Sequence, residues 1–314
     1  MSPENSMILR IGTRGSKLAL TQSTWVKERI ESAHPDLTVT LTRIQTTGDK
    51  VLDSSLSRIG GKGLFVKEIE EALLRNEVDL AVHSMKDVPG DLPGDLDLSA
   101  YPEREDPRDA LVTTDARSLS DLPGGSAVGT GSLRRSSQLL HIRPDLRIVP
   151  LRGNVDTRLR KLAAGDFQAI VLAVAGLKRL GLSSAVSYVL PPEQVLPAIG
   201  QGALGLETRK GDHATRGLIH FLNHEDTETT VRAERALLKA LGGGCQVPIA
   251  GRARLEGEEV VLEGMVAEPD GTLLVRDRVR GPRARPEELG VRLAERLLSM
   301  GADKILARIY GQTG

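Results

Sequence analysis

The first two-thirds of the chain alternates short apolar runs with segments of helical periodicity, and this alternation restricts the possible folds more than any other feature. The run MILRIGT predicts a strand, residues 16–33 a helix and residues 37–46 a second strand, and the pattern returns in residues 63–84. Such alternation is typical of βαβ units on a mostly parallel sheet. At 314 residues the chain is too long for one hydrophobic core, which predicts two or three domains with clefts between them.

The same pattern restarts after residues 101–114, a charged, proline-containing stretch that we interpret as a crossover between domains. Residues 126–144 predict a strand, a glycine-rich turn and a helix, and residues 146–182 continue the alternation. From about residue 225 onward the sequence instead predicts an amphipathic helix, alternating strands and a terminal helix over 286–306. The expected architecture is two α/β lobes followed by a small α+β domain with an antiparallel sheet.

Charge and composition disfavour several classes of protein. The 42 basic and 42 acidic residues balance, so no overall field attracts nucleic acid or anionic lipid, and 2% aromatic residues leave little to stack on bases. No apolar run approaches the length that crosses a bilayer, and the opening MSPENSMILR lacks the basic-then-apolar order of a secretory signal. We therefore expect a cytoplasmic protein that binds neither nucleic acid nor membrane.

A group of polar residues follows the predicted strand DLAVHS. His83, Ser84, Lys86 and Asp87 come at its carboxyl end, where open α/β sheets bind ligands. In a cleft, the Asp87 carboxylate can transfer protons or hold a developing cation; the alternative is a turn residue paired with Lys86. His83 has no partner at metal-binding spacing, so we predict no metal site.

Arginines gather near predicted strand ends and helix starts. Arg outnumbers Lys 31 to 11, but a GC-rich genome would account for the total, so only the individual positions argue for a function. Arg134, Arg135, Arg152 and Arg158 stand where helix N–H groups and guanidinium forks together favour a polycarboxylate or phosphate ligand over chance surface placement. The sequence therefore predicts an anionic ligand.

Two glycine-containing loops come before predicted helices. In GTRGSKLALTQ, Arg14 can clamp a carboxylate while Ser16 caps the helix, or the segment is a plain βα turn. In GGKGLF, residues 60–65, the glycines suit a hinge or lid with Lys62 at its tip, or an ordinary connection. Neither loop matches the dinucleotide fingerprint or the P-loop, so no nucleotide site is indicated.

Cys245 is the only cysteine and cannot form an intramolecular disulfide. It follows three glycines and precedes a proline in GGGCQVP, which predicts a loop and an accessible thiol. Three interpretations remain open from the residues alone: a buried small hydrophobe, a reactive thiol or an attachment point.

Nine segments, in order from residue 10 to residue 250, resemble the porphobilinogen deaminase family. They are RIGTRGSKLALTQ, GGKGLFVKEIE, AVHSMKDVP, EREDPRDAL, GTGSLRRSSQL, RGNVDTRL, AIVLAVAGLKRLG, LPAIGQGALGLE and ERALLKALGGGCQVPIA. Beyond residue 250 no motif supports the resemblance, which there rests only on the length of the segment and on its predicted α+β pattern. Gly131, where a serine is common, and Gly242, where a glutamate is common, depart from the family pattern.

The resemblance implies a fold and the boundaries of three domains. Two doubly wound lobes like those of periplasmic binding proteins enclose a cleft, one made of residues 1–102 and 203–222 and the other of residues 103–202. Residues 223–314 form the α+β domain that carries Cys245. The family joins four porphobilinogen molecules into the linear tetrapyrrole hydroxymethylbilane with release of ammonia, and the resemblance leads us to expect a monomeric enzyme.

The resemblance also implies roles for individual residues. A dipyrromethane cofactor, made from the enzyme's own substrate, is implied in thioether linkage to Cys245, and Asp87 matches the family's catalytic carboxylate. Each pyrrole carries an acetate and a propionate, so the cleft must neutralise many carboxylates. The residues implied to bind cofactor and substrate are Arg14, Ser16, Lys86, Thr130, Ser132, Arg134, Arg135, Arg152, Arg158 and Gln201. Lys62 and Phe65 are implied to belong to a mobile loop over the site.

Two other functions would also use an arginine-rich cleft. The main alternative is a noncatalytic two-lobed protein that captures a small anion, but such a protein would be expected to carry an export signal and would need no thiol. A phosphate-handling transferase should show a P-loop or a cluster of metal-binding carboxylates, and neither occurs in the sequence. Turnover of porphobilinogen with release of ammonia distinguishes the enzyme from both.

Overall fold

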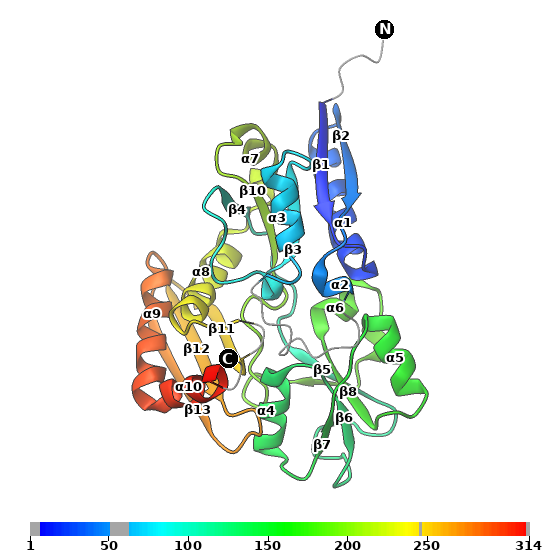
Figure 1. The fold of residues 1–314 in the computed structure, drawn as a ribbon, viewed down its shortest axis with the longest axis vertical. Coiled ribbons are helices and arrows are strands. Elements are labelled where there is room, and N and C mark those ends of the chain that lie inside the picture. The colour runs from blue at the N-terminus through cyan, green and yellow to red at the C-terminus, as the bar shows by residue number, and fades with distance from the viewer. Residues whose placement is uncertain (1–6, 51–62, 245–246, 312–314) are drawn as a thin grey trace.

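The computed structural model describes residues 7–50, 63–244 and 247–311, and its strands form three separate sheets (Figure 1). Two five-stranded sheets occupy the upper part and the lower right of Figure 1, and a three-stranded sheet lies at the lower left. The predicted fold class is confirmed in these layers: two α/β sheets and a small antiparallel sheet with helices. Within the described ranges, none of the helices combines the length and the apolar character needed to cross a membrane.

The first lobe is built on a sheet with the strand order β2-β1-β3-β10-β4. Its strands are β1 (Met7–Thr13), β2 (Leu37–Arg43), β3 (Leu80–Ser84), β4 (Leu96–Ala100) and β10 (Leu204–Arg209). Its helices are α1 (Lys17–Ala33), α2 (Thr47–Lys50), α3 (Lys67–Leu74) and α7 (His213–Ile219). Along β3, Leu80 and Val82 pack with α1 on one face while Ala81 packs with α3 on the other, because successive side chains of a strand alternate.

The second lobe is built on a sheet with the strand order β7-β6-β8-β5-β9. Its strands are β5 (Asp109–Thr113), β6 (Ala127–Gly129), β7 (Arg147–Val149), β8 (Ala169–Ala173) and β9 (Tyr188–Leu190). Its helices are α4 (Leu133–Ile142), α5 (Val155–Ala163) and α6 (Val174–Arg179). The second lobe repeats the architecture of the first, as the alternation in the sequence predicts.

In each lobe, one antiparallel strand lies between otherwise parallel strands. β10 runs antiparallel to β3 and β4, and β5 runs antiparallel to β8 and β9. Each of these strands arrives from the other lobe, β5 through residues 101–108 and β10 through residues 191–203. The crossover predicted over residues 101–114 is confirmed for residues 101–108, but it is wrong beyond them, because Asp109–Thr113 form β5 of the second-lobe sheet. The prediction of mostly parallel sheets is wrong at β5 and β10, because the chain enters each sheet from the opposite lobe.

The third domain has the antiparallel strand order β11-β12-β13. Its elements are α8 (Glu225–Ala240), β11 (Ile249–Glu256), β12 (Glu259–Ala267), β13 (Leu274–Pro282), α9 (Pro286–Leu297) and α10 (Asp303–Gly311). The prediction of one continuous terminal helix is wrong, because a π-helical turn (Leu298–Ala302) separates α9 from α10. Gly301 has a φ of 106° there, a conformation that glycine adopts without steric cost.

Glu234, on α8, fastens the third domain to both crossovers. Its fully buried carboxylate accepts hydrogen bonds from Arg104 Nη1 at 2.7 Å, from the Gly200 N–H at 2.7 Å and from the Ala253 N–H at 2.8 Å. Arg104 lies on the first crossover, Gly200 on the second and Ala253 on β11. One carboxylate therefore holds together segments that are far apart in the sequence.

Candidate functional site

A cavity of 720 Å³ lies between the two lobes and borders the third domain. The first lobe contributes residues at the carboxyl ends of β1, β2 and β3, and the second lobe contributes the starts of α4 and α5. From the third domain, Leu238, Gly244, Val247 and Ile249 contribute to the lining. The parallel strand ends of an open α/β sheet face the cavity, which is where such folds bind ligands.

Arg14 connects two carboxylates on the first-lobe wall. It donates from Nη2 to Asp49 Oδ1 at 2.5 Å, and its Nη1 lies 3.7 Å from Asp87 Oδ2. Its guanidinium carbon lies 4.3 Å from the centre of the Phe65 ring, in a cation–π contact. Arg14 was expected to clamp a ligand carboxylate, but the structure shows it engaged with two carboxylates of the protein.

Asp87 lies in a single 3-10 turn, Met85–Asp87, directly after β3. Its side chain lines the cavity and is 27% exposed. Lys86 lines the same cavity, and burial lowers the pKa of its ammonium group to about 8, against the opposing charge of Asp87. Both residues lie where the sequence predicts them, at the end of a strand.

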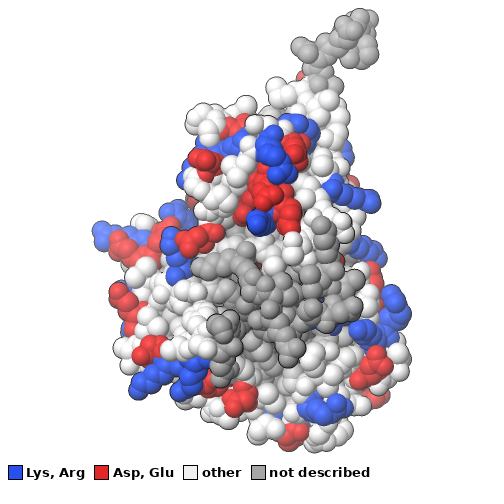
Figure 2. All heavy atoms as spheres, viewed as in Figure 1, with Lys and Arg blue, Asp and Glu red and all other residues white. Residues whose placement is uncertain are grey.

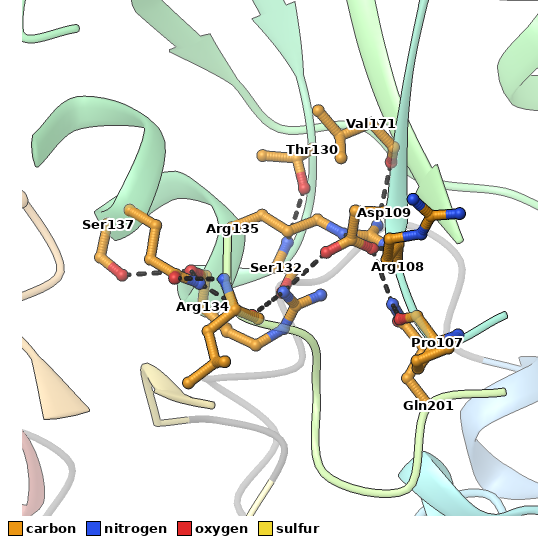
Figure 3. Close-up of polar contacts among 12 residues, drawn as sticks. Pro107, Arg108, Asp109, Thr130, Ser132, Arg134, Arg135, Ser137, Val171 and Gln201 are labelled. Atoms are coloured by element: carbon orange, nitrogen blue, oxygen red, sulfur yellow. Dashed lines mark hydrogen bonds and ion pairs between the residues drawn. The ribbon is translucent and has the colours of Figure 1, made fainter. Parts of the chain in front are cut away.

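A fully buried carboxylate, Asp109, holds the two arginines of α4 (Figure 3). Arg134 Nη1 donates to Asp109 Oδ2 at 2.7 Å, and Arg135 Nη2 donates to Oδ1 at 2.6 Å. The Gln201 side-chain amide donates to the same Oδ1 at 2.9 Å. Burial by itself raises the pKa of Asp109, but the charges of Arg134 and Arg135 and their hydrogen bonds outweigh burial and lower the pKa well below its ordinary range.

Arg134 and Arg135 therefore do more than the sequence predicts. Both line the cavity, but Arg134 also donates to the Leu196 carbonyl at 2.8 Å and Arg135 to the Val171 carbonyl at 2.9 Å. Many of their donors are thus used inside the protein. Asp109, which organises them, was not singled out from the sequence, because nothing in EREDPRDAL marks it as a partner of a later helix.

Four other cavity arginines have no carboxylate partner within residues 7–50, 63–244 and 247–311: Arg43, Arg152, Arg158 and Arg179. Burial lowers the pKa of Arg158 and of Arg179 to about 10, so both remain charged at neutral pH. Arg152 and Arg158 were predicted. Arg43 and Arg179 were missed, because only the folded lobes bring the ends of β2 and α6 to the cavity.

The predicted hydroxyl residues differ in position. Ser16 lines the cavity and caps α1 as predicted, accepting a hydrogen bond from the Ala19 N–H at 3.3 Å. Ser132 lines the cavity at the start of α4, but its side chain makes no capping hydrogen bond. Thr130 is not among the cavity-lining residues; its hydroxyl accepts from the Ser132 N–H at 3.2 Å and so supports the loop behind the wall.

Two predicted residues, Lys62 and Cys245, lie outside the described residues. Phe65, predicted with Lys62 to belong to a loop over the site, lines the cavity through its contact with Arg14. Gly244 and Val247, the described residues nearest to Cys245 on either side, both line the cavity.

The cavity concentrates positive charge in a protein that is neutral overall. Nine cationic and three anionic side chains line it, whereas the whole chain has 42 of each. On the outer face shown in Figure 2, basic and acidic side chains are mixed over the described surface. An anionic ligand is therefore attracted to the cavity rather than to that outer face.

His83 does not line the cavity. Its Nε2 lies 2.8 Å from Glu207 Oε2, and both side chains are buried. Glu70, on α3, completes this group, and its burial together with the charge of Glu207 raises its pKa to about 7. In the part of the chain that the structure describes, no group of three or more His, Cys, Asp or Glu side chains could hold a metal ion.

Family models and individual relatives match the same family over nearly the whole chain. Residues 9–217 match the family model described as "Porphobilinogen deaminase, dipyromethane cofactor binding domain", and residues 228–299 match "Porphobilinogen deaminase, C-terminal domain". The porphobilinogen deaminase of Syntrophotalea carbinolica is 56% identical over 305 residues, which are 97% of this chain and 97% of that protein. The porphobilinogen deaminase of Geobacter metallireducens is 54% identical over 302 residues, 96% of this chain and 95% of that protein.

Solved structures are similar at a lower level. The periplasmic aliphatic sulphonate binding protein of Escherichia coli matches 75% of this chain and 71% of its own, with 16% identity and a TM-score of 0.40. A nutrient binding protein of Burkholderia cenocepacia bound to methionine matches 68% of this chain and 90% of its own, with 13% identity and a TM-score of 0.42. Likeness at this level supports no conclusion about the ligand.

The two family models and the identities of 54% and 56% over nearly the whole length show that this chain belongs to the porphobilinogen deaminase family.

Proposed function

We propose that this chain joins four porphobilinogen molecules head to tail, releases one ammonia for each and frees the product by hydrolysis, in which one water supplies the hydroxyl group of hydroxymethylbilane. The observation that carries this proposal is the position of the Asp87 carboxylate, whose Oδ2 lies 3.7 Å from Arg14 Nη1. The cavity around it is lined by nine cationic and three anionic side chains. Porphobilinogen brings an acetate and a propionate into that cavity. Its carboxylates match the surplus of guanidinium groups, which bind carboxylates through paired hydrogen bonds.

The cavity also fits a dipyrromethane cofactor, which we propose is bonded to Cys245 through a thioether. Gly244 and Val247 place the chain on both sides of that segment against the cavity. Gln201 contributes a buried carbonyl oxygen, Oε1, that has no hydrogen-bond partner among the described residues and can accept a pyrrole N–H. When bound, the cofactor supplies the free pyrrole carbon to which the first substrate is joined.

Asp87 performs the proton chemistry in this proposal. As the C–N bond of the substrate's aminomethyl group breaks, ammonia leaves and positive charge spreads from the substrate carbon onto its pyrrole nitrogen. The Asp87 carboxylate accepts the pyrrole N–H hydrogen bond and stabilises this charge. After the new C–C bond forms, the attacked carbon carries an extra proton, which Asp87 removes. Arg14 and Asp49 orient the carboxylate during these steps.

The cavity arginines divide into two groups in this proposal. Arg134 and Arg135 are fixed by Asp109, which also accepts a hydrogen bond from Gln201, and they form a rigid, positively charged wall that faces the ligand. Arg152, Arg158 and Arg179 carry the guanidinium groups that receive the acetate and propionate side chains. On the match with the family, Ser16, Lys86 and Ser132 are also proposed to bind cofactor or substrate, and Thr130 supports Ser132 from behind the cavity wall.

The intact mass of the purified protein tests the cofactor and its anchor together. We expect the wild type to exceed its sequence mass by two deaminated porphobilinogen units and Cys245→Ser to show no excess, because serine offers no thiolate to form the thioether. Circular dichroism should show that the variant still folds. If the wild type shows no excess even after incubation with porphobilinogen, the fold is retained without the chemistry, and the protein is a two-lobed anion-binding protein instead.

The alkaline side of the pH profile tests Lys86. Since its pKa is about 8, the ammonium group is charged below that pH and loses its charge as the pH rises through it. We expect kcat/KM for porphobilinogen to fall above about pH 8, because a cation that binds a carboxylate is lost. Lys86→Arg keeps its charge throughout this range and should move the fall to higher pH. If kcat/KM falls at the same alkaline pH in Lys86→Arg as in the wild type, another group causes the fall.

We further propose that the chain acts as a cytoplasmic monomer with three domains, made of residues 1–102 with 203–222, residues 103–202 and residues 223–314. The three separate sheets and the two crossovers support this division. The monomeric state follows from the expectation for the family.

A further inference from the structure

Arg43 is the last residue of β2, at the edge of the sheet that faces the cavity. Its backbone is in register with Thr13, the last residue of β1, and the Ile44 N–H donates to the Thr13 carbonyl at 2.8 Å. Arg14 therefore comes directly after the end of the neighbouring strand, β1. The carboxyl ends of β1, β2 and β3 bring three cations to this edge: Arg14, Arg43 and Lys86.

The three cations differ in how the protein uses them. Arg14 is held by Asp49 and Asp87, and Lys86 is adjacent to Asp87. Arg43 is exposed and lines the cavity, and within the described ranges no carboxylate oxygen lies within ion-pair distance of its guanidinium. Its fork of N–H donors is therefore available for a ligand.

The other cavity arginines without a carboxylate partner, Arg152, Arg158 and Arg179, all belong to the second lobe. Porphobilinogen carries two carboxylates, on adjacent ring carbons. A monomer that enters between the lobes meets these three guanidinium groups on one side, of which Arg158 and Arg179 each also donate to one backbone carbonyl at 2.7 Å. On the first-lobe side, Arg43 is the arginine in the described lining that holds no carboxylate.

We propose that Arg43 is a further substrate-binding residue, which binds a carboxylate of the incoming porphobilinogen on the first-lobe rim of the cavity. Its exposure distinguishes it from Arg14 and Asp87, whose side chains are 22% and 27% exposed. An exposed cation at the rim meets each monomer before the monomer reaches Asp87. Arg43 therefore contributes to capture rather than to chemistry, and this role rests on the proposed turnover of porphobilinogen.

Steady-state kinetics with porphobilinogen test this role in Arg43→Gln. We expect KM to rise about three- to tenfold while kcat stays near the wild-type value, since one charge-assisted hydrogen bond to the substrate is lost. Arg43→Lys should recover part of the loss, because it restores the charge without the planar fork. The matched control is Arg147→Gln: Arg147 is also exposed, begins β7 and does not line the cavity, so its KM should not change.

Intact mass measured on the same samples separates capture from cofactor assembly. Arg43→Gln should carry the same mass excess as the wild type. A KM equal to that of the wild type would overturn the proposal, as would a loss confined to kcat or a variant that lacks the cofactor mass. A wild type with no turnover at all would contradict the proposed function instead, which keeps the two failures distinct.

Discussion

Asp87→Asn should reduce kcat for hydroxymethylbilane formation by roughly 10²- to 10⁴-fold, the usual contribution of a positioned acid–base group. Asparagine has nearly the same shape, but it is neutral and cannot take up a proton from the attacked carbon. It also removes the negative charge that stabilises the cationic pyrrole next to Arg14. Ammonia release and tetrapyrrole formation, measured separately, should fall together, because both follow from the same cationic intermediate.

Folding and substrate binding should change little in Asp87→Asn, since the side chain is partly exposed and its ion pair with Arg14 is long at 3.7 Å. The matched control is Asp91→Asn, four residues further on. Asp91 is 59% exposed, pairs with Lys239 and does not line the cavity, so its removal should leave kcat unchanged. Near-normal turnover by Asp87→Asn would remove Asp87 from the chemistry.

The sequence predicted the features that depend on a few neighbouring residues. Ser16 was expected to cap a helix, and its hydroxyl accepts from the Ala19 N–H. DLAVHS was expected to be a buried strand with Asp87 beyond its end, and β3 and the following turn have this form. A cap or a strand end is set by side chains within one turn of the chain, so the local pattern suffices to recognise it.

Partners from distant segments could not be predicted in this way. Asp109 meets Arg134, 25 residues later, and Gln201, 92 residues later, because both crossovers and α4 converge behind the cavity. Asp49, which holds Arg14, lies in TTGDK, where no motif marks it. Arg43 also reached the cavity only through the pairing of β2 with β1. Periodicity shows which face of an element is buried, but it contains no information about which charged groups will meet there.

Asp109→Asn should have the largest effect on stability among the cavity variants. Removing one partner from a buried ion pair costs about 3–5 kcal/mol, because the other charge stays buried without compensation. Here two such charges remain, since Arg134 and Arg135 are 6% and 7% exposed. Whole proteins are stable by only about 5–15 kcal/mol, so urea denaturation should show a large fall in the midpoint of unfolding.

The pH dependence of this effect follows from the lowered pKa of Asp109. A carboxylate whose pKa is depressed in the folded state stabilises the protein at every pH above its ordinary value of 3.8, and this stabilisation is lost only as the pH falls toward the lower, folded-state pKa. The difference in stability between wild type and Asp109→Asn should therefore be constant across the neutral range and shrink only in strong acid.

Asp106→Asn is the matched control, three residues away. Asp106 pairs with Arg108, whose side chain is 42% exposed, and exposed pairs contribute about 0–1 kcal/mol. A small loss in Asp106→Asn beside a large one in Asp109→Asn would show that burial of the arginines sets the energy. Equal losses would contradict this role, because Asp109 holds two buried arginines, whereas Asp106 holds one arginine that is exposed. Asp109 then would not be the group that holds the positive wall of the cavity in place.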